Sequence, residues 1–185
     1  MCKLCQEKPV YEFTNQRKLC KNCFIEYFQK KFLYTIRKFN LIKQGEKIGY
    51  KKGLNVNDVV LKEMLIFLSK KSNFILLEMP KKNIDKLAIS ECIDSESNKI
   101  LDKLINSDIS KLKDNLPYIK EKKIIKPLYL FLQQEITLFA ELKRLKFNKP
   151  KFKKDRISQF IDEFEKPHPE VKRAVINSLL KIYKI

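Results

Sequence analysis

The chain is poor in the residues on which several common active sites depend. Its 185 residues include one histidine, three glycines and no tryptophan. A Ser-His-Asp triad would have to use His168, which lies between two prolines and is better suited to the start of a helix. The glycines form neither a Gly-Gly pair nor a G-x-x-x-x-G-K-[ST] run. The sequence therefore excludes a serine-hydrolase triad and shows no standard phosphate-binding loop.

Long apolar runs are also missing. No uninterrupted apolar stretch approaches the ~20 residues that a membrane-spanning helix needs. Lys3 and Lys8 interrupt the beginning of the chain, where a secretory leader would be apolar. We therefore expect a cytoplasmic protein with no membrane partner.

Acidic residues are few relative to basic ones. The chain has 40 Lys and Arg against 22 Asp and Glu, a formal net charge of +18. Such a positive field favours a polyanionic partner, and RNA or DNA is the usual one. The alternative is a generic solubilising surface, because the abundance of Lys, Ile, Asn and Phe also suggests an AT-rich coding bias.

Cysteine is concentrated at the start of the chain. Cys2 and Cys5 form one C-x2-C pair, Cys20 and Cys23 form a second, and 14 residues separate the pairs. Two such turns can present four thiolates to one tetrahedral metal ion, and this spacing predicts a structural zinc site. Reduced or disulfide-paired thiols are the alternative. A shell of four thiolates leaves no open position for a substrate, so the metal would hold the fold together rather than catalyse.

The remaining thiol, Cys92, stands alone. Its neighbours Glu91 and Asp94 are acidic, whereas an activated cysteine needs cationic partners. We expect Cys92 to be a small buried residue, and we predict no catalytic residue in the chain.

Hydrophobic periodicity predicts short strands separated by helices, a pattern typical of a parallel α/β sheet. Aromatic residues between 24 and 39 recur at helical intervals and are expected to face the core. The expected parts are a zinc ribbon at 1–24, a connecting amphipathic helix at 25–44, an α/β domain at 45–150 and C-terminal helices at 151–185. Within the α/β domain, we expect residues 73–79 to form a buried strand and residues 59–70 and 133–146 to form helices.

Several motifs, taken in order, resemble one family. They are Cys2-x2-Cys5, Cys20-x2-Cys23-Phe24, Tyr27-Phe28-x2-Lys31-Phe32 and Leu41-Ile42-x2-Gly45-Glu46-Lys47-Ile48. Together they resemble the opening of the cytoplasmic tRNA 2-thiolation proteins, zinc-ribbon relatives of the PP-loop ATPases. Weaker similarity continues through residues 86–88, 96–104, 125–128 and 134–140. The resemblance implies a reduced PP-loop-like sheet with flanking helices behind an N-terminal four-cysteine ribbon.

One departure from the family pattern shapes the functional expectation. Catalytic members carry a Ser-Gly-Gly-x-Asp-Ser loop that holds the ATP pyrophosphate, directly after the strand that here ends near Ile48. This chain has residues 49–58, Gly-Tyr-Lys-Lys-Gly-Leu-Asn-Val-Asn-Asp, in that place. It also has no cysteine after Cys92 for sulfur transfer or a cluster. The resemblance therefore implies a pseudo-enzyme, the non-catalytic second subunit, which binds a catalytic tRNA thiolase and tRNA.

Phosphate contacts are expected from basic residues on the first long helix and near the C-terminal helices. These are Lys30, Lys31, Arg37, Lys38, Lys151, Lys153, Lys154 and Arg156. Two other functions remain open: a self-sufficient thiolase, and a stand-alone zinc-ribbon factor that binds nucleic acid in transcription or translation.

Overall fold

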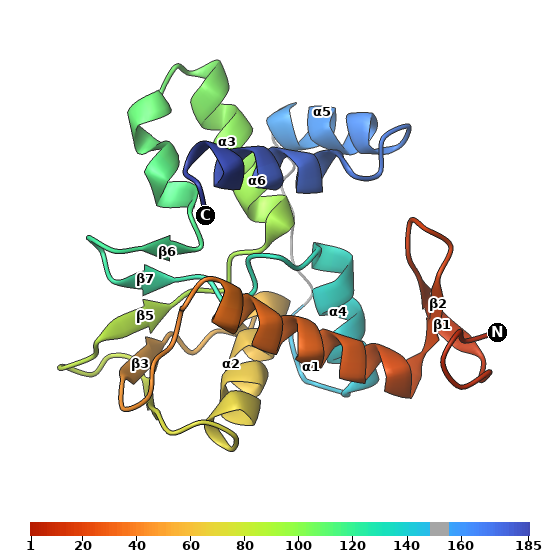
Figure 1. The fold of residues 1–185 in the computed structure, drawn as a ribbon, viewed down its shortest axis with the longest axis horizontal. Helices are drawn as coiled ribbons and strands as arrows, with labels where there is room; N and C mark the ends of the chain where they lie inside the picture. Colours follow the sequence, from red (N-terminus) through yellow and green to blue (C-terminus); the bar gives the residue numbers. More distant parts are fainter. Residues whose placement is uncertain (149–155) are drawn as a thin grey trace.

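The computed structural model describes residues 1–148 and 156–185. Within them the chain alternates between short strands and helices, as Figure 1 shows. The strands are β1 (Pro9–Glu12), β2 (Lys18–Cys20), β3 (Lys47–Tyr50), β4 (Ile75–Glu78), β5 (Lys86–Ala88), β6 (Tyr118–Ile119) and β7 (Ile124–Ile125). The helices are α1 (Lys21–Lys38), α2 (Val56–Ser69), α3 (Ile93–Ile105), the 3-10 helix η1 (Ile109–Asn115), α4 (Gln133–Leu142), α5 (Arg156–Glu165) and α6 (Val171–Ile182).

The main sheet has the strand order β4-β3-β5-β7-β6. Strand β3 pairs in parallel with both β4 and β5, β5 pairs in parallel with β7, and only β6 is antiparallel. After β3 the chain passes through α2 to β4 on one side and then returns to β5 on the other. The direction of winding therefore reverses between β3 and β5. This confirms the expected α/β class with a parallel sheet and flanking helices.

Strand β4 differs from expectation. Residues 73–79 were predicted to form a buried strand, but β4 is the edge of the sheet and Ile75 at its start is 48% exposed. A run of apolar residues cannot by itself distinguish a central strand from an edge strand, because the identity of the neighbouring strands decides burial.

Helix α1 connects the N-terminal hairpin of β1 and β2 to the rest of the molecule (Figure 1). Its aromatic stripe is core, as predicted: Phe24, Phe28 and Phe32 are completely buried. The ring of Phe28 stacks on Phe139 of α4 with centroids 4.1 Å apart, and it lies 4.4 Å from the ring of Phe131. At the other end of the chain, α5 and α6 lie beside α3 (Figure 1). No helix in the described ranges has the length and apolar character needed to cross a membrane.

A buried carboxylate fastens α1 to α4. Glu135 is fully buried in the first turn of α4, where it accepts a hydrogen bond from the backbone N–H of Leu132 at 2.8 Å. From α1 it accepts the hydroxyl of Tyr27 at 2.9 Å and the ammonium of Lys31 at 2.6 and 2.9 Å. Burial lowers the pKa of Lys31, and the opposite charge of Glu135 opposes that shift. The two charges compensate each other in a site that water hardly reaches.

We predict that Glu135→Gln destabilises the fold by about 3 kcal/mol, because it leaves the Lys31 ammonium buried without its counter-ion. The lower end of the usual range applies, since the Lys31 side chain keeps 12% exposure. Urea unfolding measures the loss. Glu141→Gln, an exposed change on the same helix, serves as the matched control and should stay within about 0.5 kcal/mol of the unaltered chain. Equal effects of the two changes would contradict the role assigned to Glu135.

Candidate metal centre and active site

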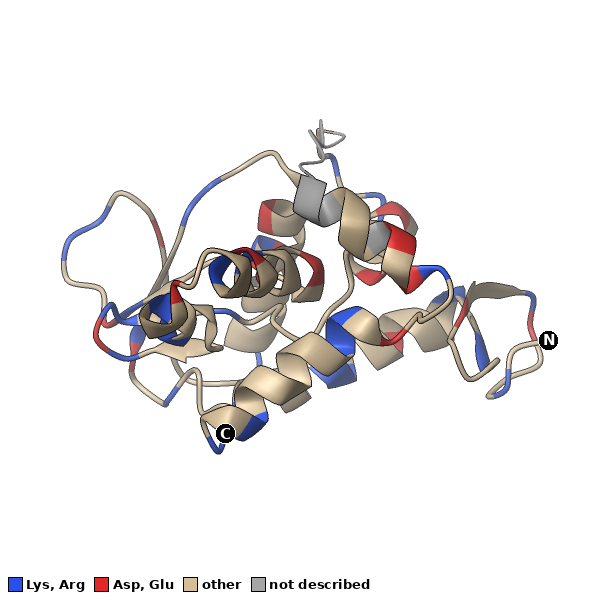
Figure 2. Ribbon diagram, turned by 90° about the horizontal axis from the view of Figure 1, so that it is seen from above, with Lys and Arg blue, Asp and Glu red and all other residues tan. Residues whose placement is uncertain are grey.

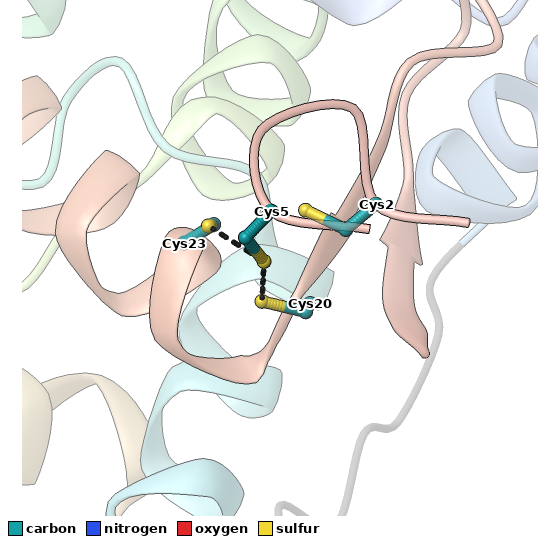
Figure 3. Close-up of side chains that lie close together, drawn as sticks. All are labelled: Cys2, Cys5, Cys20 and Cys23. Carbon is teal, nitrogen blue, oxygen red and sulfur yellow. Dashed lines mark hydrogen bonds between the residues drawn. The ribbon is translucent and has the colours of Figure 1, made fainter. Parts of the chain in front are cut away.

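The four N-terminal cysteines converge, although 17 residues separate the first from the third in the chain. Figure 3 shows Cys2 and Cys5 on the first loop, Cys20 at the end of β2 and Cys23 in the first turn of α1. The Sγ atom of Cys5 lies 3.3 Å from that of Cys20 and 3.6 Å from that of Cys23. All four sulfur atoms lie within 4.8 Å of one another. This arrangement suits a metal bound by four thiolates.

The thiols of this cluster differ in the direction of their pKa shifts. Burial alone would raise the pKa of Cys2, but hydrogen bonds from the backbone of Leu4, Cys20 and Cys5 outweigh it and bring the pKa to about 6. The N–H of Leu4 donates to Cys2 Sγ at 3.5 Å. Contact with Cys5, followed by burial, raises the pKa of Cys23. Thiols packed this closely cannot all ionise unless a cation compensates them, so the geometry calls for a metal.

The ribbon is anchored to the α/β domain by apolar contacts and one long-range hydrogen bond. Leu19 of β2 is completely buried, and Tyr11 of β1 packs against Phe24 with ring centroids 5.0 Å apart. The hydroxyl of Thr14 donates to Glu170, just before α6, at 2.6 Å. A domain of this size has little core of its own, and these contacts supply the burial that it lacks.

A second candidate site lies where the sheet reverses direction. A pocket of about 170 Å³ is formed by the segments that follow β3 and β5 and by the first residue of α4. Its lining is mainly polar: Asn55, Val56, Asn57, Ser90, Glu91, Ser95 and Gln133. In open α/β sheets, ligands bind at this place, outside the carboxyl ends of the strands where the winding reverses.

Two amide side chains hold this switch-point pocket together. The Asn57 amide donates to Gln133 Oε1 at 3.1 Å, and Gln133 donates to Asn57 Oδ1 at 2.7 Å. Ser90 donates to Asp58 Oδ1 at 2.5 Å. The pocket thus joins α2, the segment after β5 and α4. Sequence analysis missed Asn57, Ser90 and Gln133. A signal was available for Gln133, which begins a predicted helix, and for Ser90, which follows a short apolar run at 87–89, but not for Asn57, which precedes the helix expected at 59–70.

Hydrogen bonds between Asn55 and Asp58 hold the loop between β3 and α2 against the first turn of α2. Asn55 caps α2 by accepting the N–H of Asp58 at 2.8 Å, and its amide also donates to the Asp58 carboxylate. Gly53 packs directly on Asp58: an added Cβ would meet the carboxylate oxygen at 1.9 Å. This position accepts only glycine without a shift of Asp58. Lys51 and Lys52 on the same loop are exposed.

Cys92 is buried, as expected. It is completely inaccessible and is the N-cap residue of α3, where the amide of Asn57 donates to its sulfur at 3.8 Å. Burial, followed by the negative charge of Asp94, raises the pKa of this thiol to about 12. It is therefore protonated at neutral pH and poorly suited to act as a nucleophile.

The predicted phosphate contacts on α1 differ in their surroundings. Lys31 is paired with Glu135, whereas Lys30 is exposed and pairs with Glu26 at 2.6 Å. The guanidinium of Arg37 donates to the carbonyl of Leu33, and Lys38 lies over the rings of Tyr34 and Phe39. Lys151, Lys153 and Lys154 fall outside the described residues, and Arg156 begins α5 with a side chain that is not described. Figure 2 shows that Lys and Arg are spread over loops and helices along the ribbon.

Comparison with known proteins gives one informative result. No family model and no curated protein sequence matches the chain. Among solved structures, the chain is similar to a U34-tRNA thiolase, NcsA from Methanococcus maripaludis, described with its [4Fe-4S] cluster. The TM-score is 0.76 at 18% sequence identity, and the match covers 99% of this chain and 87% of the other. The chain has the fold of this thiolase.

The comparison corrects two expectations. The chain was predicted to be a pseudo-enzyme, but the similar structure is that of an enzyme, and its fold is present here over nearly the full length. The metal was predicted to be zinc, but the similar structure carries a [4Fe-4S] cluster. Four thiolates are also the ligands of such clusters, so cysteine spacing did not justify the choice of zinc.

Measurement of the bound metal distinguishes the four clustered thiols from Cys92. We predict that Cys20→Ser lowers the metal bound per chain several-fold and loosens the ribbon, because one ligand of the shell is lost. Cys92→Ser is the matched control and should leave the metal content unchanged. Elemental analysis of iron, other metals and inorganic sulfide on anaerobically purified protein measures both. Equal loss of metal in the two variants would overturn the assignment of ligands.

Proposed function

We propose that this chain is an enzyme of tRNA thiolation, which replaces the C2 oxygen of a wobble uridine by sulfur. The observation that carries the proposal is the polar pocket at the switch point of a sheet whose fold matches a U34-tRNA thiolase. The sequence motifs at residues 1–48 support the same family independently of the fold.

The reaction requires activation of the C2 oxygen of uridine, which is a poor leaving group. In the proposed reaction the C2 oxygen of uridine attacks the α-phosphorus of ATP, and the bond to pyrophosphate breaks. A sulfur nucleophile of the sulfide class then attacks C2, and AMP departs with the original oxygen. Because Cys92 is buried and protonated, the sulfur comes from a donor other than this thiol.

The chain's own residues can assist the first step without the missing Ser-Gly-Gly loop. Asn57 and Gln133 bind each other, which leaves the second N–H of the Gln133 amide and the second lone pair of Asn57 Oδ1 for a nucleotide at the pocket. Lys51 and Lys52 add positive charge on the adjacent loop. A pocket of about 170 Å³ is smaller than a site for a whole ligand of drug size. It therefore accommodates one part of the nucleotide, and the remainder lies over the open edge of the sheet.

The four cysteines fit an iron–sulfur group in ligand type and number. Their spacing is that of a shell around one metal ion: with metal–sulfur bonds of about 2.3 Å, a tetrahedron has edges of about 3.8 Å. In a [4Fe-4S] cluster each cysteine binds a different iron atom, and the four irons are separated from one another. The four cysteine sulfur atoms around such a cluster would therefore lie farther apart than they do here. No step of the proposed reaction takes place at this metal.

A second subunit of the thiolation system and tRNA are the proposed partners. Affinity purification from the native cell tests both, since recovery of a tRNA-thiolation protein together with tRNA supports the proposal. Consistent recovery of RNA polymerase or ribosomes instead would favour the stand-alone nucleic-acid-binding factor.

We predict that Asn57→Ala lowers ATP-dependent thiolation of tRNA about 10- to 100-fold, because a hydrogen-bonding group at the pocket is worth about 1–3 kcal/mol when lost. Incorporation of radioactive sulfide into tRNA, measured under anaerobic conditions, gives the rate. Ser110→Ala, an exposed change on η1, is the control and should retain full activity.

The thermal midpoint of each variant shows whether the protein is still folded. If the metal-loaded, unaltered chain neither binds ATP nor thiolates tRNA, with or without its purified partner, the proposal fails.

A further inference from the structure

Two hollows lie along one side of α1, and they share part of their lining. The first, of about 380 Å³, is bounded by the cysteine ribbon and α1, and the second, of about 220 Å³, lies between α1 and α6. Lys31 and Tyr34 line both. We call the combined depression, with its walls from the ribbon, α1 and α6, the α1 groove.

The charged residues that line the α1 groove are predominantly cationic. Its ionisable residues with a fixed charge are Arg17, Lys30, Lys31, Lys38 and Arg173, against the single acid Glu26. Three of these cations already have carboxylate partners: Lys30 with Glu26, Lys31 with Glu135 and Arg173 with Glu170. Within the described part of the chain, Arg17 and Lys38 have none.

Arg17 and Lys38 are placed at opposite ends of the groove. The Arg17 guanidinium lies over the ring of Phe13 at 4.5 Å, and its buried Nε has no hydrogen-bond partner among the described residues. The Lys38 ammonium lies 5.9 Å from the ring centroid of Tyr34. An anionic ligand would supply the missing partner for each.

An aromatic ring stands between these two cations. Tyr34 is 51% exposed although it projects from a helix whose other aromatic residues are mostly buried. A half-exposed ring flanked by uncompensated cations suits a nucleotide, whose base can stack on the ring while its phosphates meet the cations. The side chains of Asp and Glu in an acidic peptide could satisfy the charges, but they have no aromatic ring to stack on Tyr34.

We propose that the α1 groove binds unpaired nucleotides of an RNA loop, with Tyr34 as the stacking surface and Arg17 and Lys38 as phosphate contacts. Single-stranded RNA is specified because the faces of bases within a duplex are covered by their neighbours and cannot reach Tyr34. The inference rests on the proposed function, for which the anticodon loop of tRNA would be the loop in question. Tyr34 acts in positioning the RNA and is not a catalytic residue.

Binding of a fluorescently labelled anticodon stem-loop RNA to the full metal-loaded chain, followed by anisotropy, tests the groove. Tyr34→Ala should weaken binding about 5- to 100-fold, whereas Tyr34→Phe should retain it, since the ring and not the hydroxyl is required. Lys38→Ala should weaken binding and reduce the slope of log affinity against log salt concentration by about one. Lys113→Ala, an exposed lysine on η1 outside the groove, should have much less effect than Lys38→Ala.

The outcomes separate this inference from the proposed function. If the unaltered chain thiolates tRNA but Tyr34→Ala and Lys38→Ala bind the stem-loop normally, the groove is not the binding surface and the proposed function stands. Competition by duplex RNA or by polyglutamate as effective as that of the unlabelled stem-loop would also overturn the assignment to unpaired nucleotides. If the unaltered chain binds no RNA and thiolates none, both proposals fail.

Discussion

The stacking of Phe28 on Phe139 joins the two parts of this molecule, and both candidate sites depend on it. Phe28 comes from α1, which begins at the metal ribbon, and Phe139 comes from α4, whose first residue lines the switch-point pocket. The Glu135 carboxylate lies one turn before Phe139 and binds Lys31 and Tyr27 of α1. Apolar stacking and buried ion pairing thus fix α1 against α4 along adjacent turns, so the ribbon and the pocket share one rigid support.

The pocket itself follows from the order of the strands. Since β4 and β5 lie on opposite sides of β3, the segments that leave β3 and β5 separate at the carboxyl edge of the sheet. The Asn57–Gln133 pair spans the opening that results, and Ser90 bonds to Asp58 beside it. This explains how a pocket forms although the chain has no glycine-rich loop after β3. The glycines of a phosphate-binding loop let the backbone approach the ligand closely, whereas the opening itself results from the order of the strands.

Local sequence predicted the local features well. The aromatic core stripe and the α/β class follow from patterns within one segment, because periodicity reports the face that a segment buries. The connecting helix was expected at 25–44, whereas α1 spans Lys21–Lys38. The burial of Cys92 agrees with the expectation from its acidic neighbours. Strand β6 was not predicted, since a strand of two residues shows no periodicity. The edge position of β4 was not predicted either, because it depends on which strands lie beside it. The contacts of Asn57 with Gln133 and of Lys31 with Glu135 join residues 76 and 104 positions apart. Such pairs become visible only once the chain is folded.

The same limit applies to the charges and to the metal. A net charge of +18 identifies an affinity for anions but not the residues responsible, because a lysine with a buried carboxylate partner contributes little to an external ligand. Lys31 belongs to an RNA-binding pattern in sequence and to the core in the structure, whereas Arg17 drew no attention in sequence and retains an unpartnered Nε. Four cysteines likewise specify a thiolate shell without specifying its metal. In each case the residue type defines the chemistry that is possible, and the partners supplied by the fold decide which part of that chemistry remains open to a ligand.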